Sequence, residues 1–315
     1  MVNFLNLKYF VMIAEEGNIT RVAESEHVSQ QSLSSHIKKL EKSFGVRLFE
    51  RGSGISLTYA GERVYEYAVR LLRTKSDMEN ELLDLTESGQ GVLRIGISYT
   101  RGCAFLPEIL PTFRAENPFV KTDITENNSQ VLEEYLLRGH IDLYIGANLR
   151  HQREIEITDL CSEKLFLVIP KTTAEEIYGT THGLFLPEKP LEVFLKYDFL
   201  MLSKANRIRK MIDECLEKKE LCANILIETE NIETLFELSC RGMGITIYPE
   251  MFLKKHTELL KNEDASIRLV PVAEKGCEST LSVGYNKNRY LSSAAKRFID
   301  IAKSLLGEEN TTQSK

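Results

Sequence analysis

Residues 17–51 of the chain read GNITRVAESEHVSQQSLSSHIKKLEKSFGVRLFER, two short helical patterns separated by a break at residues 27–28. In the second pattern apolar residues recur at steps of four, three and four positions, which places them on one face of an α-helix. They are Leu33, Ile37, Leu40 and Phe44. Ser29 is suited to cap the second helix, and the small Ala23 would let the two helices cross closely. The stretch therefore predicts a pair of crossing helices.

The polar residues of the second helix turn away from its apolar face. They are Gln30, Gln31, Ser34, Ser35 and Lys38. Amides and hydroxyls can read the edges of bases, and a lysine can sit on a phosphate. An ordinary helical hairpin with a solvated polar face has the same pattern. Two helices alone therefore leave DNA binding and a plain hairpin open.

The residues that follow decide between these interpretations, because they predict a wing. Residues 45–51 have the pattern of an apolar strand, residues 52–54 that of a turn, and residues 55–58 that of a returning strand. The sequence thus predicts a winged helix-turn-helix over residues 1–61, with the helix-turn-helix at about residues 19–38.

This run of residues resembles the head of the LysR-type transcriptional regulators. The family's motifs are matched, at their spacing, by Val22-Ala23, Ser29-Gln30, Ser34, Leu40-Glu41, residues 45–51 (GVRLFER) and residues 57–61 (LTYAG). The resemblance implies binding to double-stranded DNA. The candidate DNA-binding residues are Thr20, Arg21, Gln30, Gln31, Ser34, Ser35, Lys38 and Arg51. Gln30 and Ser34 face outward at the start of the recognition helix and are expected to read bases, while Thr20, Arg21, Lys38 and Arg51 are expected to hold phosphate.

Three positions depart from the family's pattern. Glu26 stands where the first helix usually has a leucine, so we expect the helix pair to tilt or Glu26 to lie at a partly wet edge. Gln31 replaces the usual proline, and Ser35 replaces the usual arginine. These two changes alter what the recognition surface can contact, so the target sequence of relatives does not transfer to this chain.

The composition is that of a globular protein large enough for two or three compact units. The chain has 315 residues, of which 43% are hydrophobic and 27% charged. No apolar run approaches the roughly 20 residues of a membrane-spanning helix, and no signal peptide is visible, so a cytoplasmic protein is expected. The net charge is −6, but residues 1–65 hold eight basic against seven acidic residues. A near-neutral head on an acidic body is compatible with a local DNA-binding patch.

Six cysteines and six histidines are scattered without metal-ligand spacing, and no phosphate loop, dinucleotide fingerprint or nucleophile elbow is present. We therefore expect no metal, no cofactor and no catalytic site. A peroxide-sensing branch of the LysR-type family uses two cysteines in the second half of the chain. Aligned with that branch, Arg207 stands in the place of the reactive cysteine and Cys215 lies only near the partner position, which disfavours redox sensing.

Residues 62–87 contain neither proline nor glycine and carry a heptad seam. The seam consists of Val64, Ala68, Leu71, Lys75, Met78, Leu82 and Leu85. A helix packed on its own domain would also be amphipathic, but the heptad period and the place between two domains favour pairing with a second copy. Lys75 lies on the seam, where a polar residue costs stability but can fix register. We expect a homodimer through a linker at residues 62–90, and the family resemblance implies that dimers join into tetramers.

After the break at residues 88–91, strand and helix patterns alternate, which indicates a mostly parallel α/β sheet. Strands are predicted at residues 92–97, 122–125, 142–145, 165–169, 199–202, 225–227, 245–247, 267–270 and 281–284. Helices are predicted at residues 104–116, 129–138, 207–219, 232–241 and 292–306.

The resemblance to the LysR-type family continues through residues 93–96 (LRIG), Phe113 with Pro118, and residues 139–143, 233–235 and 242–245 with Pro249. It implies a regulatory domain at residues 91–307 that is similar to periplasmic binding proteins, with two α/β lobes and a ligand cleft between them. Lobe 1 is expected at about residues 91–165 and 272–306, and lobe 2 at about residues 166–271. Residues 308–315 are polar and are expected to be a disordered tail.

Polar side chains follow several of the predicted strands and match the effector-contacting positions of the family. They are Ser98, Thr100, Asn128, Ser129, Ser203 and Thr246. Ligands of α/β sheets bind at such places, where helix N-termini present N–H groups to anions. With Arg101 nearby, these side chains suit a small anionic or polar metabolite, although each could also serve only as a helix cap.

A transcriptional regulator controlled by a metabolite is therefore the predicted function. Two alternatives remain open at this point. One is an enzyme on a binding-protein-like fold with an accessory DNA-binding head, and the other is an architectural DNA-binding protein with a vestigial cleft.

Overall fold

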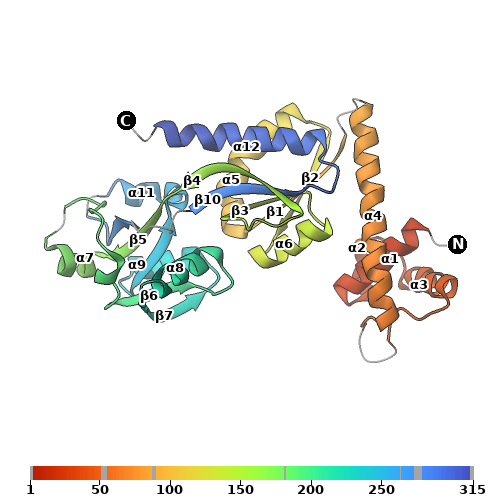
Figure 1. The fold of residues 1–315 in the computed structure, drawn as a ribbon, viewed down its shortest axis with the longest axis horizontal. Helices are drawn as coiled ribbons and strands as arrows, with labels where there is room; N and C mark the ends of the chain where they lie inside the picture. Colours follow the sequence, from red (N-terminus) through yellow and green to blue (C-terminus); the bar gives the residue numbers. More distant parts are fainter. Residues whose placement is uncertain are drawn as a thin grey trace. The chain divides into compact units, whose positions relative to one another are not determined.

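The structure is a computed structural model that describes residues 3–50, 55–86, 90–180, 182–262, 264–272 and 279–312. The chain divides into two units, Met1–Thr86 and Glu87–Lys315. Figure 1 draws the first unit in red to orange and the second in yellow through blue. The first unit has a hydrophobic core of its own, and the buried residues of the second unit form two further clusters.

The described residues of the first unit include four helices: α1 (Phe4–Glu16), α2 (Ile19–Ser25), α3 (Gln30–Phe44) and α4 (Tyr59–Leu85). Each is preceded by a residue whose side chain accepts a hydrogen bond from the backbone of the first turn: Asn3, Asn18, Ser29 and Thr58. Such caps satisfy N–H groups that have no partner inside the helix. The predicted helix-turn-helix and its Ser29 cap are confirmed.

The core of this unit contains most of the predicted apolar face of α3. Its members from α3 are Leu33, Ile37 and Leu40. Phe44 differs from the prediction, because it lies in the last turn before Gly45 and is 40% exposed. Ala68 and Val69 of α4 belong to the same core, so the first turns of the long helix are anchored on the head.

The wing appears in the described residues as an antiparallel bridge between Phe49 and Leu57. Its tip, with Arg51, lies outside the described residues. Helix α4 then passes so close to Leu48 that a Cβ at Gly61 would lie 2.1 Å from the Leu48 carbonyl oxygen. Glycine is therefore required where α4 leaves the wing.

Glu26 lies at the C-terminal end of α2, and its carboxylate is 2.6 Å from Lys8 Nζ. The Glu26 side chain is 23% exposed. The charge that replaces the expected leucine is thus paired at a partly wet edge, which is the second of the two outcomes that the sequence allowed.

Helix α4 begins at Tyr59, earlier than predicted, because the Thr58 hydroxyl caps it. The first seam residues, Val64 and Ala68, pack against the core of the head. The apolar residues further along are exposed: Leu71 (51%), Met78 (54%), Leu82 (54%) and Leu85 (74%). Lys75 on the seam pairs with Glu79 one turn later. The second half of α4 therefore presents an uncovered apolar stripe.

In the second unit the described residues form two five-stranded sheets, with strand orders β2-β1-β3-β10-β4 and β7-β6-β8-β5-β9. The strands are β1 (Gly91–Ile97), β2 (Val120–Glu126), β3 (Leu143–Ala147), β4 (Ile155–Glu163), β5 (Leu165–Pro170), β6 (Asp198–Leu202), β7 (Asn224–Thr229), β8 (Ile245–Pro249), β9 (Ile267–Pro271) and β10 (Ser279–Asn286). In each sheet the first two pairs of neighbours are parallel and the other two are antiparallel, so the sheets are mixed rather than mostly parallel.

The helices of this unit are α5 (Tyr99–Glu116), α6 (Ser129–Arg138), α7 (Lys171–Tyr178), α8 (Arg207–Glu217), α9 (Ile232–Cys240), α10 (Glu250–Leu253), α11 (Thr257–Leu260) and α12 (Ser293–Thr312), with 3-10 turns at Leu191–Val193 and Lys254–His256. Helix α12 packs on β4 and beside α5 (Figure 1).

The chain crosses between the sheets twice, from β4 to β5 and from β9 back to β10. Each sheet with its helices is one lobe: residues 90–163 and 279–312 form lobe 1, and residues 165–180, 182–262 and 264–272 form lobe 2. The predicted two-lobed architecture is confirmed. It places the carboxyl ends of the parallel strands, with the helices that follow them, around the space between the lobes.

Some elements differ from the prediction for local reasons. Strand β4 (IEITDLCSE) was missed because an edge strand that leads out of its lobe has no regular alternation of polar and apolar residues. Helix α7, directly after Pro170, was also missed. Helix α5 begins at Tyr99 rather than 104, and α12 continues to Thr312, through most of the predicted disordered tail.

Candidate functional site

The outer face of α3 carries the residues that the sequence assigned to DNA. Gln30, Gln31, Ser35 and Lys38 are exposed, and Ser34 is half-buried. They lie opposite the buried residues of α3, so the hydrophobic core does not restrain them. This face can therefore offer amides and hydroxyls to base edges and one ammonium group to a phosphate.

Thr20 and Arg21 lie in the first turn of α2, and both are exposed. The Arg21 guanidinium is 3.0 Å from the Glu16 carboxylate, and its side chain is 72% exposed. Exposed ion pairs are weak, so Arg21 can exchange this partner for a phosphate at little cost. Arg51, the remaining predicted phosphate contact, lies outside the described residues.

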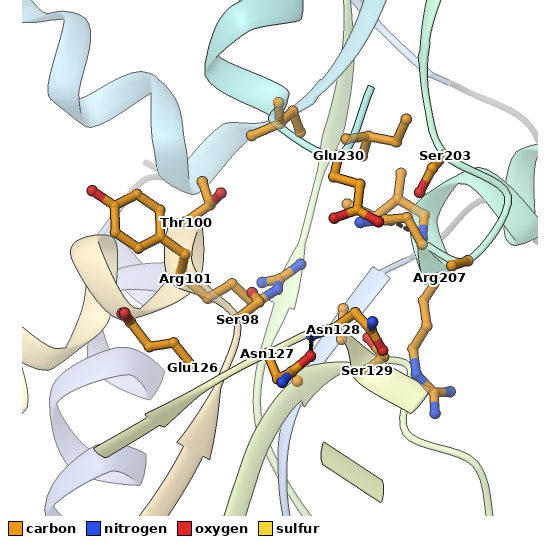
Figure 2. A pocket seen from close by; sticks show the side chains of 18 of the residues that line it. Ser98, Thr100, Arg101, Glu126, Asn127, Asn128, Ser129, Ser203, Arg207 and Glu230 are labelled. Atoms are coloured by element: carbon orange, nitrogen blue, oxygen red, sulfur yellow. Dashed lines mark hydrogen bonds between the residues drawn. The ribbon is translucent and has the colours of Figure 1, made fainter. Parts of the chain in front are cut away.

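A pocket of about 500 Å³ lies between the two lobes of the second unit (Figure 2). Ser98, Thr100, Asn128 and Ser129 line it from lobe 1, and Ser203 lines it from lobe 2. The structure thus brings together five of the six predicted effector residues from three separate stretches of chain.

The sixth predicted residue, Thr246, lies elsewhere. It is 1% exposed in the middle of the second sheet, where it pairs with Leu200 and Val168. Thr246 stands near the start of its strand, inside the sheet, rather than at the carboxyl end that faces the pocket, so the structure does not bring it together with the other five. Its hydroxyl has no hydrogen-bond partner among the described residues.

Four helices begin at the pocket: α5, α6, α8 and α9. Three of them are capped by asparagine side chains, with Asn128 Oδ1 accepting from Val131 N at 3.1 Å, Asn206 Oδ1 from Ile208 N at 2.9 Å, and Asn231 Oδ1 from Glu233 N at 3.0 Å. Ser98, at the start of α5, makes no such side-chain bond. The Ser98 hydroxyl is therefore open to a ligand, whereas the oxygen of Asn128 is occupied as a cap.

Ser129 has a neighbour inside the wall of the pocket. Its side chain lies beside that of Tyr144, which is buried on β3. Burial raises the pKa of the Tyr144 phenol, while the Ser129 hydroxyl and nearby Arg101 act in the opposite direction. Ser129 therefore lines the pocket next to the Tyr144 phenol.

Arg101 lines the pocket, and the sequence did not indicate its partners. Its guanidinium forms two bonds with Glu163, at 3.1 and 3.0 Å, and lies 5.5 Å from the centre of the Phe252 ring. Ser279 Oγ donates to the same carboxylate at 2.7 Å. The side chains of Arg101 and Glu163 are 7% and 0% exposed. This buried cluster joins α5 to the ends of both crossover strands, β4 and β10.

Arg207 connects the two lobes across the pocket. It is the first residue of α8 in lobe 2, yet its guanidinium donates to the Asn148 carbonyl oxygen of lobe 1 at 2.7 Å and pairs with Glu133 on α6. Burial lowers the pKa of Arg207. Asn148 holds a left-handed backbone with φ 46° and bonds to β10 through Thr280 N at 2.8 Å. Nothing in the sequence indicated this contact, because its members are far apart along the chain.

Two acidic residues also line the pocket, Glu126 at the end of β2 and Glu230 directly before the Asn231 cap. Both are exposed. In Figure 2 the Glu230 carboxylate reaches from lobe 2 into the space opposite Ser98 and Arg101. The predicted site for a small anionic or polar metabolite did not include these carboxylates.

The remaining candidate chemistry is sparse. The five described cysteines are free thiols, and burial raises the pKa of Cys240 to about 11. Among the described residues, no group of three or more acidic, cysteine or histidine side chains has the arrangement of a metal site. The helices in the described part of the chain also include none that is long and apolar enough to cross a membrane.

Comparison with known proteins identifies two family models that match the chain. The model for the bacterial regulatory helix-turn-helix protein, lysR family, matches residues 4–62. The model for the LysR substrate binding domain matches residues 86–307. The HTH-type transcriptional regulator YybE of Bacillus subtilis (strain 168) is 29% identical over 244 residues, covering 77% of this chain and 78% of the relative.

Solved structures have the same fold. A full-length OxyR variant from Pseudomonas aeruginosa matches with a TM-score of 0.70 and 22% identity, over 97% of this chain and 95% of that one. Full-length CbnR in complex with its target DNA matches with a TM-score of 0.64 and 21% identity, over 96% and 99%.

Proposed function

The chain belongs to the LysR family of transcriptional regulators, and from that premise we propose that a small molecule bound between its lobes controls how two paired heads occupy a DNA site. The observation that carries this proposal is the pocket of about 500 Å³ whose walls come from both lobes. A ligand held by both lobes favours one arrangement of them, and it shifts DNA occupancy by its difference in affinity for the two arrangements. Couplings of this kind are typically about 1–3 kcal/mol.

In this proposal the face of α3 enters the major groove. Gln30 and Ser34 contact bases, with Gln31 and Ser35 beside them, and Thr20, Arg21, Lys38 and Arg51 hold phosphates. The exposure of the described members and the cap at the start of α3 support this assignment. The protein acts where the DNA is, which in a bacterial cell is the cytoplasm.

The exposed stripe on α4 supports pairing of two copies through this helix. Four large apolar side chains at heptad spacing, 51–74% exposed, gain free energy when a second helix covers them. A closed pair would present two heads to a twofold DNA site. Exposed apolar residues also lie on the edge strands β2 and β7: Ile124, Ile225 and Leu226. They provide a second surface through which dimers could join into tetramers.

Leu71→Asp tests the pairing, because it places a charge in the middle of the stripe. We expect this variant to sediment as a monomer and to lose specific DNA binding. Thr74→Asp adds the same charge to an exposed position off the seam and should leave the dimer intact. A Leu71→Asp protein that remains dimeric would exclude the stripe as the main contact.

The proposal as a whole is tested by footprinting the purified protein on the DNA beside its own gene, with and without candidate metabolites. We expect a protected site of twofold symmetry whose extent changes with one class of metabolite. A footprint that no small molecule alters would favour an architectural DNA-binding protein instead.

We further propose that the pocket releases its ligand unchanged, so that the protein is not an enzyme. The ligand recovered after long incubation with the protein should be chemically identical by NMR. Turnover of the ligand would support the alternative of an enzyme with an accessory DNA-binding head.

A further inference from the structure

The charges around the pocket are unevenly compensated. Both of its arginines already have carboxylate partners from lobe 1: Arg101 is paired with Glu163, and Arg207 with Glu133. These pairs are largely buried, with side-chain exposures between 0% and 14%. Neither arginine therefore contributes an uncompensated positive charge to a ligand.

The carboxylates of Glu126 and Glu230 are in the opposite situation. Within the described residues neither forms an ion pair, although both line the pocket. Glu126 lies over the first turn of α5, since a Cβ on Gly102 would be 3.0 Å from its Oε1 atom. Glu230 lies before the N-terminus of α9. The pocket thus combines a ring of helix N-termini with two carboxylates that form no ion pair within the described part of the chain.

The helix N-termini and the unpaired carboxylates favour oppositely charged groups of a ligand. Helix N-termini and the Ser98 hydroxyl favour an anionic group, and Arg101 retains N–H groups that can donate to it. A ligand that covers Glu230 with apolar or anionic atoms removes water from that carboxylate without replacing its hydrogen bonds, which is unfavourable. A ligand with a positively charged nitrogen at that point replaces the water with an ion pair.

We infer that the effector is a zwitterion of the amino-acid type, with its anionic group at Ser98 and Arg101 in lobe 1 and its cationic nitrogen at Glu230 in lobe 2. The two ends of the ligand then contact opposite lobes (Figure 2). Each end alone would hold one lobe, whereas the zwitterion stabilises the arrangement in which both are close. Glu126 lies instead over the first turn of α5, beside the anionic end of the ligand, so the cationic subsite is Glu230 alone.

The inference also predicts which molecules the pocket rejects. A dicarboxylate of similar size would bring a second negative charge to Glu230, so like-charge repulsion would oppose its binding. A simple amine would lack the anionic group that the N-terminus of α5 recognises. The pocket volume of about 500 Å³ accommodates a small metabolite of this class.

This inference rests on the proposed function, and calorimetric titration of the full-length protein tests the two separately. The probes are the twenty coded L-amino acids, the 2-oxo acid that corresponds to each, and simple alkylamines and dicarboxylates. We expect at least one amino acid to bind, and to bind at least about tenfold more tightly than its 2-oxo acid, since a charge-assisted contact is lost. The same amino acid should alter the DNA footprint.

Variants locate the cationic end of the ligand. Glu230→Gln should weaken binding of the amino acid about tenfold or more and leave the affinity for its 2-oxo acid unchanged or higher. Glu237→Gln, on the exposed side of α9 and outside the pocket, is the matched control and should bind like the wild type. Glu230→Lys should reverse the preference in favour of dicarboxylates.

The possible results separate the zwitterion inference from the proposed function. If a 2-oxo acid or dicarboxylate binds and shifts the footprint while no amino acid does, the zwitterion inference fails and the proposed function stands. Equal affinity of the wild type and Glu230→Gln for an amino acid would also overturn it. If no probe of any class binds, the inference fails, and a footprint that no metabolite alters would remove the proposed function as well.

Discussion

The DNA-facing side of α3 and the pocket between the lobes carry similar polar groups, but their positively charged side chains differ in exposure and pairing. On α3 the Lys38 side chain is exposed, and on α2 Arg21 forms only an exposed ion pair with Glu16. In the pocket both arginines are held by buried carboxylates. The cations on α2 and α3 can bind the phosphates of DNA. The arginines of the pocket are instead paired with carboxylates that hold helices and lobes in place. The same residue types therefore contribute binding energy in one region and architecture in the other.

The largest effect should follow from removing the buried cation of the pocket. Arg101→Ala leaves Glu163 buried without its partner, and breaking such a pair typically costs about 3–5 kcal/mol. We expect urea unfolding of the full-length protein to show a destabilised second unit. Arg297→Ala removes an arginine from an exposed pair with Glu116 and should change stability little. Equal losses in the two variants would contradict the distinction between buried and exposed cations.

A base contact on α3 should give the next largest effect, on binding rather than on folding. Gln30→Ala should weaken binding to the specific site by about 1–3 kcal/mol and change binding to random DNA little. Ser34→Ala is expected to act in the same direction, and Ser43→Ala, at the far end of α3, is the control. Equal losses on both kinds of DNA would remove Gln30 and Ser34 from the base-reading set.

Removing the exposed lysine should act on both kinds of DNA together. Lys38→Ala should weaken specific and random binding alike and lower the slope of log affinity against log salt by about one. Lys39→Ala removes the same charge from the neighbouring, differently directed position and should change the slope less. A salt dependence that is unchanged in Lys38→Ala would show that its charge does not meet a phosphate.

The smallest effect should come from a single hydroxyl in the pocket. Thr100→Val keeps the volume of the side chain but removes one hydrogen bond, worth about 0.5–1.5 kcal/mol, to the effector. DNA binding without effector should stay as in the wild type. Thr112→Val makes the same change further along α5, outside the pocket. Unchanged effector affinity and an unchanged footprint shift in Thr100→Val would exclude the hydroxyl from the site.

The recognition helix could be predicted from sequence because everything that defines it is local. The spacing of Leu33, Ile37 and Leu40 sets the buried face, the opposite face follows from helix geometry, and Ser29 caps the same helix. The positions of the apolar stripe on α4 likewise follow from the heptad spacing, which is also local. Phe44 departs from the pattern only because the helix ends at the next residue.

The pocket could be predicted only in part, because its chemistry depends on pairs that are far apart in the chain. Strand ends identified Ser98, Asn128 and Ser203, which line the pocket. The same rule selected Thr246, which lies inside the sheet, since a sequence does not show which end of a short strand faces the pocket. Arg101 was noticed without Glu163, which stands 62 residues later on a strand without regular alternation. Only the folded chain reveals that the arginines are already neutralised.

The exposed apolar stripe on α4 has a consequence for how DNA-site occupancy depends on the concentration of the chain. If the two heads act only as a pair, the active species is a dimer whose abundance, at low concentration, rises with the square of the chain concentration. Doubling the gene dose would then raise occupancy of a weak site about fourfold, whereas a monomeric binder would raise it only twofold. The copy number of the chain would become a second input beside the effector, and a promoter that controls its own gene could use it as a threshold.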